Sequence, residues 1–242
     1  MNETLRLLQA HHSSRSYKSD AIPVEIIDAI IESAYRAPTS VNSQQISLVV
    51  VRDSASRPRI AEIAGGQRGI AQAPVFIAVI ADLYKAGLGV DKAGTQQVFQ
   101  HSLEAIFSAV SEAGIAMATL MTADRAFGLG IVPMGGIRRD QQAINDLLGL
   151  PLNTFPVGGV VLGYIDEVAT QKPRLPIESF RHEEISFGNA EGVNRFLRSD
   201  FADVLVEDRA HGRTRLVGQY GAILRLNIQE NQVSRSTSRF HN

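Results

Sequence analysis

Two short cationic segments, far apart in the chain, carry residue types that could bind an anion. The first runs from His11 to Arg15 and has the sequence HHSSR. In an extended backbone alternate side chains point to one side, so His11, Ser13 and Arg15 would present an imidazole, a hydroxyl and a guanidinium together. These groups suit a phosphate or a polarised carbonyl, and each hydrogen bond to a charged group contributes roughly 1.5–3 kcal/mol. Taken alone, the segment is more typical of a solvated surface turn.

The second cationic segment is Lys172-Pro173-Arg174-Leu175-Pro176. Pro173 fixes its own φ and restricts Lys172 to an extended backbone, so Lys172 and Arg174 are expected to project to the same side. A rigid pair of cations loses less conformational entropy on binding an anion than a flexible pair does. Lys-Pro-Arg is also common in exposed loops, so this segment gains weight only in combination with the others.

Neutral polar groups are concentrated in the segment 38–44, between an expected helix and an expected strand. Its hydroxyl and amide side chains could meet the edge of a heterocycle or a polyol chain; they belong to Thr39, Ser40, Asn42 and Gln44. Gln67, which follows Gly65 and Gly66, has both a donor and an acceptor and suits the edge of a pyrimidine-like ring. The alternatives are an ordinary capping turn at 38–44 and a helix C-cap at the two glycines.

The glycine-containing segment 128–136 is a further candidate for ligand contact. Its glycines do not follow a strand into a helix in the pattern of a dinucleotide fingerprint. Gly135 and Gly136 would nevertheless allow a close approach of the backbone and a free N–H aimed at a ligand. The alternative is a tight turn before the helix that Asp140 is expected to cap.

Hydrophobic periodicity predicts the elements that position these segments. Helices are expected at 5–9, 23–37, 57–64, 96–127 and 141–148, and strands at 46–51, 75–81, 157–165 and, with less support, 222–228. The long helix 96–127 is apolar on nearly all sides, which indicates burial on several sides and a dimer interface. Helices interleaved with three buried strands indicate an α/β or α+β sandwich.

Composition restricts the class of protein. The 242 residues are 44% hydrophobic and 20% charged, with a net charge of −1, so a sizeable core is expected and a general attraction to nucleic acid or an anionic membrane is not. The chain has no cysteine, which excludes disulfides and Cys-ligated metals and is compatible with the cytoplasm. We expect no signal peptide, no membrane span and, from the spacing of the six histidines, no metal site.

In their order and spacing, these segments resemble the flavin-binding signature of the nitroreductase family, in the group of the oxygen-insensitive NADPH nitroreductases and flavin reductases. The resemblance runs from about His11 to about His182. It implies an α+β fold: a three-layer sandwich whose central, mostly antiparallel sheet is flanked by helices. It also implies a segment-swapped homodimer with FMN at the subunit interface. We therefore expect an FMN-binding domain at 1–187 and, at 188–242, a divergent extension of the same domain that embraces the partner.

The resemblance also implies roles for single residues. His11, Ser13, Lys172 and Arg174 would hold the FMN phosphate. Arg15 would lie near the N1–O2 edge of the flavin, and Gln67 would contact the ring. The partner subunit would supply Thr39, Ser40, Asn42 and Gln44, whereas the backbone of Pro133, Met134, Gly135 and Gly136 would face the flavin. His12 stands where relatives commonly carry arginine, which would make its contact with the phosphate sensitive to pH near neutrality.

The implied activity is that of an FMN-dependent NAD(P)H oxidoreductase, which reduces nitroaromatics, quinones or free flavin by ping-pong hydride transfer. FMN would carry the chemistry, so no catalytic side chain is expected. NADPH is favoured over NADH, with five arginines as candidates to bind a 2′-phosphate: Arg195, Arg198, Arg209, Arg213 and Arg215. The alternatives are a reductive dehalogenase-type relative, a non-catalytic FMN-binding redox sensor, and a plain α/β domain with basic residues on its surface.

Overall fold

The computed structural model describes residues 1–167, 169–172, 174, 177 and 180–184. The chain divides into two units, 1–171 and 172–242. The helices and strands named below belong to the first unit. The predicted strand at 222–228 and the five candidate arginines between 195 and 215 lie outside the described residues.

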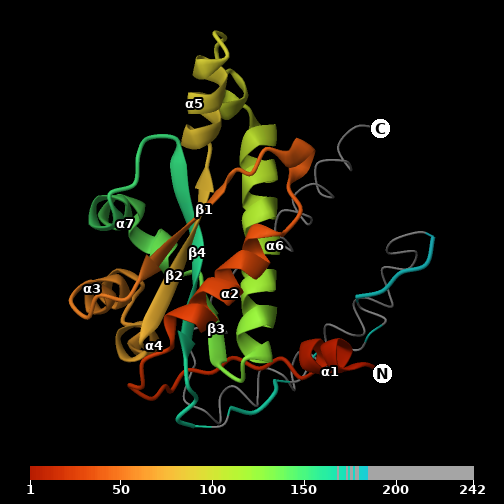
Figure 1. The fold of residues 1–242 in the computed structure, drawn as a ribbon, viewed down its shortest axis with the longest axis vertical. Coiled ribbons are helices and arrows are strands. Elements are labelled where there is room, and N and C mark those ends of the chain that lie inside the picture. Colours follow the sequence, from red (N-terminus) through yellow and green to blue (C-terminus); the bar gives the residue numbers. More distant parts are fainter. Residues whose placement is uncertain (168, 173, 175–176, 178–179, 185–242) are drawn as a thin grey trace, which may run out of the picture. The chain divides into compact units, whose positions relative to one another are not determined.

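The core of the first unit is a four-stranded antiparallel sheet with the strand order β1-β2-β4-β3 (Figure 1). Its strands are β1 (Ile46–Val51), β2 (Val75–Asp82), β3 (Gly130–Met134) and β4 (Thr154–Gly163). Every residue of the central strand β2 is buried. The prediction of a strand at 46–51 is confirmed, but its expected burial was wrong: β1 lies at the sheet edge, and five of its six residues are only partly buried.

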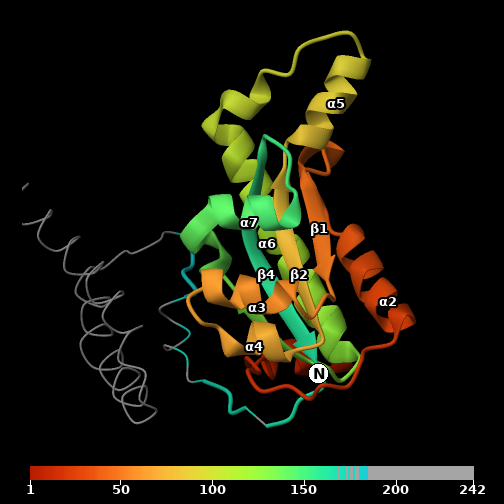
Figure 2. The same ribbon diagram turned by 90° about the vertical axis from the view of Figure 1, so that its left-hand side faces the viewer.

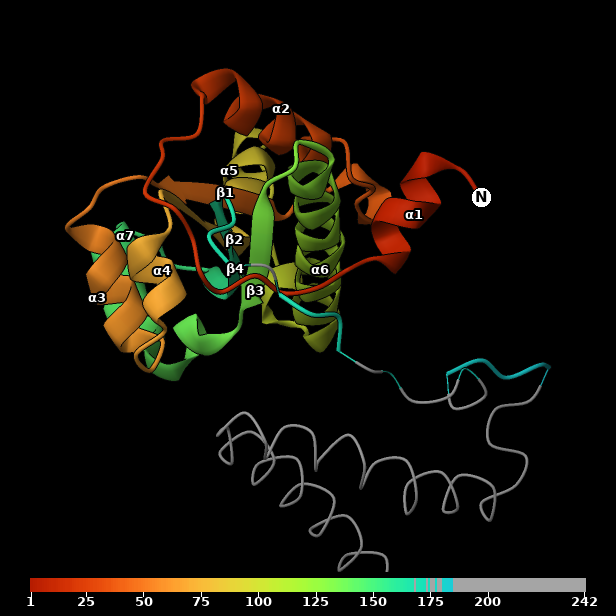
Figure 3. The same cartoon turned by 90° about the horizontal axis from the view of Figure 1, so that it is seen from below.

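Helices cover both faces of this sheet, so the fold is the expected three-layer α+β sandwich (Figures 2 and 3). One face carries α3 (Ser56–Ile63), α4 (Arg68–Gln72) and α7 (Gln141–Leu148). The other face carries α2 (Val24–Tyr35) and α6 (Leu103–Ala126). Successive side chains of β2 alternate between two hydrophobic clusters, as the period of a strand requires: Phe76 packs with the first set of helices and Ile77 with the second.

The shorter predicted helices are confirmed, with small shifts at their ends. They correspond to α1 (Glu3–Gln9), α2, α3 and α7. The ends of α7 follow the predicted chemistry: Asp140 Oδ1 accepts a hydrogen bond from the Ala143 N–H at 3.0 Å, and Gly149 ends the helix with φ 64°. Helices α4 and α5 (Tyr84–Lys92) and the 3-10 turns η1 (Ser40–Asn42), η2 (Phe99–His101) and η3 (Gly136–Asp140) were not predicted.

The long helix differs from its prediction in two respects. It begins at Leu103 instead of residue 96, because Ser102 caps it by accepting the Ala105 N–H at 3.1 Å. Four alanines, among them Ala109, let α6 lie close to the sheet and share its buried face with Leu120 and two acidic residues, whereas Phe107 is exposed. By length and composition α6 would also fit a membrane span, as core helices of soluble proteins do; here it packs against α2 and all four strands of the sheet.

Strand β3 was not predicted, because the glycines of segment 128–136 favour a tight turn. It is short and contains Pro133, which a strand tolerates at the sheet edge where β3 lies. Gly130 is required at its start, since a Cβ there would lie 2.9 Å from Ser14 Oγ. Strand β4 begins at Thr154, earlier than the predicted residue 157, and ends at Gly163.

Candidate functional site

The segment after α1 runs along the end of the sheet where β3 begins and β4 finishes. The Ser14 N–H donates to Ile131 O at 2.8 Å, and the Lys18 N–H donates to Tyr164 O at 2.9 Å. The side chains of Ser14 and Tyr17 are buried, and Tyr17 Oη donates to Ser14 O at 2.6 Å. With these two side chains turned inward, Arg15 is exposed at the surface.

Two side chains anchor the chain just before this segment. Arg125, at the end of α6, donates from Nη2 to Ala10 O at 3.0 Å and from Nη1 to Leu7 O. Gln171 Nε2 donates to Gln9 O at 2.6 Å. His12 turns back toward the same helix end, with Nδ1 at 3.1 Å from Ala10 O. These contacts hold the end of α1 in place and so position the backbone of His11 and Ser13, whose side chains are half-buried.

Three of the predicted contact segments meet around Gly69 of α4. A Cβ at Gly69 would lie 3.4 Å from Arg15 O, 3.5 Å from Tyr17 Cε2 and 3.9 Å from Met134 Cε. Gln67, two residues earlier, is exposed at the N-cap position of α4, after Gly65 and Gly66 with φ of 86° and 80°. The fold thus brings together the backbone of Arg15, the helix that follows the Gly-Gly-Gln turn and the end of β3.

The Gly135-Gly136 pair has a packing role that the sequence did not reveal. A Cβ at Gly136 would lie 2.5 Å from Ala64 O, so this glycine allows the turn after β3 to contact the end of α3. Gly135 is exposed, Pro133 is partly buried, and Met134 is buried. Of the pair, Gly135 is therefore the more exposed, and the guanidinium of Arg138 lies against it.

The polar segment 39–45 adopts a strained conformation that a buried carboxylate holds in place. Glu112 of α6 is only 3% exposed. It accepts hydrogen bonds from the Ser40 N–H at 2.8 Å, the Gln45 N–H at 3.3 Å and the Ser43 hydroxyl at 3.3 Å. Three residues of the segment other than glycine have left-handed backbones: Val41, Asn42 and Gln44, with φ of 46°, 55° and 52°. Such strain is common at functional sites.

This segment lies at the opposite end of the sheet from Arg15. Gln45 O accepts from the Asp82 N–H at 2.8 Å, at the last residue of β2. The first residue of β2, Val75, pairs with Leu162 near the strand end that Tyr17 covers. The eight residues of β2 span roughly 25 Å at about 3.3 Å per residue. Within one copy of the chain, the structure therefore does not bring Thr39, Ser40, Asn42 and Gln44 to Arg15.

Lys172 and Arg174 lie at the start of the second unit. Both side chains are exposed, and Arg174 Nη1 donates to Lys172 O at 3.4 Å. Their convergence with His11 and Ser13 remains a prediction.

Sequence reasoning missed the buried polar groups that support the site. Asp124 of α6 is fully buried, and neither carboxyl oxygen has a hydrogen-bond partner among the described residues. Burial raises the pKa of Asp124 to about 8. Burial, together with the charge of Asp124, also raises the pKa of Tyr17 above its ordinary value. The helical spacing could have predicted this burial, because Asp124 lies four residues after Leu120 and eight after Ala116, on the buried face of α6.

Comparison with known proteins identifies the family. The family model described as "Nitroreductase family" matches residues 8–164. An FMN reductase [NAD(P)H] of Bacillus subtilis is 38% identical over 185 residues, which cover 76% of this chain and 74% of that protein. An NADPH-flavin oxidoreductase of Vibrio harveyi is 29% identical over 207 residues, covering 84% of each chain. The chain belongs to the nitroreductase family.

Solved structures agree with this assignment. The hypothetical oxidoreductase YcnD from Bacillus subtilis superposes with a TM-score of 0.83 at 34% identity, covering 88% of this chain and 86% of that one. The NADPH:FMN oxidoreductase from Vibrio harveyi, complexed with NAD+, superposes with a TM-score of 0.74 at 28% identity, covering 88% and 94%. The predicted fold class is therefore confirmed, whereas the swapping of segments between subunits stays a prediction.

Proposed function

We propose that the chain is an FMN-dependent NAD(P)H oxidoreductase that reduces nitroaromatics, quinones or free flavin by ping-pong hydride transfer. The observation that carries this proposal is the meeting of Arg15, the Gly-Gly-Gln turn and the end of β3 around Gly69, in a fold of the nitroreductase family. The named relatives are flavin reductases, which supports the reductase over the sensor and dehalogenase alternatives.

The residues present fit FMN in their chemistry. An imidazole, a hydroxyl and three cations suit its phosphate and its N1–O2 edge; they belong to His11, Ser13, Lys172, Arg174 and Arg15, with His12 beside them. Gln67 offers an exposed amide for the ring edge, and Gly135 is exposed as well. When bound, FMN supplies hydride transfer from NAD(P)H to the acceptor. The chain's own part is to bind and orient, and to place a guanidinium where negative charge develops.

A homodimer is part of the proposal. The outer face of α6 exposes large apolar side chains at helical spacing: Leu103, Ile106, Phe107 and Val110 are 72%, 52%, 66% and 38% exposed. An apolar face of this kind is typical of a surface that a partner covers. The separation of segment 39–45 from Arg15 gives a second reason, because a partner copy would supply these polar side chains to the flavin.

Further parts of the proposal concern the C-terminal region and the donor. We place the FMN-binding domain at 1–187 and a partner-embracing extension at 188–242, with NADPH as the favoured donor and the cytoplasm as the location. Steady-state kinetics with NADPH and NADH measure the donor preference directly. A preference for NADH would contradict the part assigned to the arginines between 195 and 215.

The decisive experiment is spectroscopic. Purified protein should show flavin absorbance at about 450 nm, a property of the cofactor, and anaerobic NADPH or NADH should bleach it. Turnover with a nitroaromatic or a quinone should follow without loss of flavin. Bound flavin that no nucleotide reduces would favour the redox sensor instead, and a colourless protein that takes up no FMN would refute the proposal.

Two variants test the positions of the cations. Arg15→Ala and Lys172→Ala should each weaken FMN binding by about 1.5–3 kcal/mol, because each removes one charge-assisted contact. Arg36→Ala, an exposed arginine at the end of α2, is the matched control and should leave FMN affinity unchanged. If both site variants bind FMN as tightly as the control, the proposed anion site is wrongly placed.

A further inference from the structure

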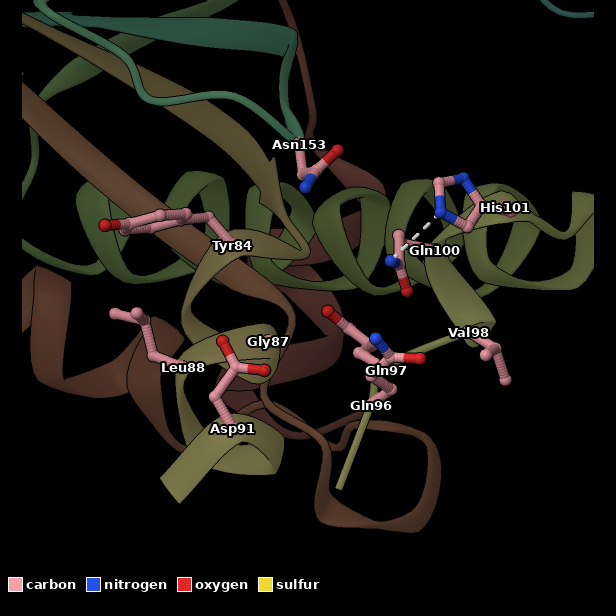
Figure 4. A pocket seen from close by; sticks show the side chains of 10 residues that line it. All are labelled: Tyr84, Gly87, Leu88, Asp91, Gln96, Gln97, Val98, Gln100, His101 and Asn153. Carbon is pink, nitrogen blue, oxygen red and sulfur yellow. Dashed lines mark hydrogen bonds between the residues drawn. The ribbon is translucent and has the colours of Figure 1, made fainter. Parts of the chain in front are cut away.

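A ligand-sized pocket lies at the end of the first unit remote from Arg15, between α5, the segment that contains η2, and the turn before β4 (Figure 4). Its volume of about 440 Å³ falls within the range of small-molecule sites. Nothing in the proposed FMN site uses the residues that line it. Asn153 closes one side, and its carbonyl accepts a hydrogen bond from the Leu83 N–H at 3.0 Å, just before α5.

The lining is rich in amides and poor in charge. Four of the ten lining side chains are amides, each with a donor and an acceptor: Gln96, Gln97, Gln100 and Asn153. All ten lining residues lie in the described part of the chain, and none is a lysine or an arginine; Asp91 is the one carboxylate among them. Such a lining is unsuited to a phosphate and suited to an uncharged group with several hydrogen-bonding atoms.

Two features indicate that the pocket is prepared for a ligand. Gln100 Oε1 is buried without a hydrogen-bond partner, although its Nε2 lies 3.2 Å from His101 Nε2. A buried amide oxygen without a partner is costly, and a ligand donor would satisfy it once the Gln100 side chain turns this oxygen toward the pocket. Asn153 has a left-handed backbone with φ 62°, a conformation that recurs at ligand-binding positions.

We propose that this pocket binds an uncharged nucleoside. The ring of Tyr84 offers a surface on which a base can stack. Glutamine and asparagine pair with the N6 and N7 atoms of adenine, so the amides suit a purine edge. Asp91 can accept hydrogen bonds from ribose hydroxyls, as carboxylates do in dinucleotide sites.

Such a nucleoside could be free, or it could be the adenosine end of NADH, whose ribose carries no 2′-phosphate; the second source rests on the proposed function and applies to NADH rather than to NADPH. The pocket adjoins the segment that we expect to meet the partner's flavin, because Asp82, two residues before Tyr84, donates its N–H to Gln45 O at 2.8 Å. A donor nucleotide held over that flavin could therefore extend toward the pocket.

Two glycines of α5 provide a matched pair of variants. A Cβ at Gly87 would lie 2.6 Å from Gln97 Oε1, so Gly87→Ala displaces Gln97 and narrows the pocket. A Cβ at Gly89 meets nothing within 4 Å. Alanine favours a helix over glycine at both positions, so neither variant endangers folding. Gln100→Leu removes the unsatisfied amide at nearly constant size and serves as a second test.

Calorimetric titration of the protein as purified with adenosine tests the proposal. Adenosine should bind the parent and Gly89→Ala equally, and about three- to tenfold more weakly to Gly87→Ala and Gln100→Leu, a loss equivalent to one neutral hydrogen bond. No binding of adenosine to the parent, or equal binding to all four proteins, would overturn the proposal. This titration does not depend on flavin, so a colourless protein would refute the proposed function and leave this test intact.

Kinetics then distinguish the two sources of the nucleoside. If the pocket holds the adenosine of the donor, Gly87→Ala should raise the KM for NADH and leave unchanged the KM for reduced nicotinamide mononucleotide, which lacks adenosine. If adenosine binding is weakened while both KM values stay at those of Gly89→Ala, the ligand is a free nucleoside.

Discussion

The buried carboxyl of Asp124 makes the stability of the protein depend on pH in a defined way. Its side chain is fully buried without a hydrogen-bond partner among the described residues, and burial raises its pKa to about 8. The unfolded chain loses the same proton near pH 4. Between these two values the native state binds one proton more than the unfolded state. The free energy of unfolding therefore falls as the pH rises through this window.

Asp124→Asn removes this titration, so comparing the variant with the parent gives the size of the pH effect on the free energy of unfolding. One proton changes the free energy of unfolding by about 1.4 kcal/mol per pH unit, so the parent should lose about 3 kcal/mol relative to the variant between pH 5 and pH 7. The difference should level off above a pH of about 8. The buried amide adds an offset that is the same at every pH, so the slope is the quantity that tests the reasoning.

Urea unfolding between pH 5 and pH 9, with the same excess of FMN throughout, measures this difference. Asp28→Asn, at an exposed position of α2, reports the general effect of removing one negative charge. Subtracting the parent's curve from each variant's curve cancels the pH dependence of FMN binding that both proteins share. A difference between parent and Asp124→Asn that is constant from pH 5 to pH 9 would refute a carboxyl kept neutral by burial.

Three further perturbations test the segment 39–45 and the outer face of α6. Glu112→Ala should lower the free energy of unfolding by about 3 kcal/mol and weaken FMN binding, because it leaves several donors of the segment unsatisfied; unchanged urea unfolding would contradict this. Val41→Gly should stabilise the protein by about 1 kcal/mol, since a β-branched side chain that is 94% exposed gains little there and strains a left-handed backbone. Phe107→Asp should shift the protein from dimer to monomer in sedimentation and weaken FMN binding, and a variant that stays dimeric at micromolar concentration would count against the proposed interface.

Local chemistry made part of the fold predictable. Helix α7 is the clearest case, because its Asp140 cap and its final Gly149 each act within one turn of the helix. Strand β3 was not predictable on these grounds, since a five-residue segment with a glycine and a proline becomes a strand only through its pairing with β4. The start of α6 was missed for a related reason. Apolar residues before Leu103 continue the helical pattern, but the helix itself begins only after its N-cap at Ser102.

The sequence by itself determined which residue types are available to hold a phosphate and a ring, because imidazole, guanidinium and amide groups keep their chemistry in any fold. The tertiary structure alone decided which of them meet. It brings Arg15, the Gly-Gly-Gln turn and Met134 together around Gly69 and holds the segment 39–45 at the far end of β2. It also forms the amide-lined pocket beside α5 from residues as distant as Tyr84 and Asn153. Such contacts depend on strand pairing and on packing across the sheet, which no local pattern of residues specifies.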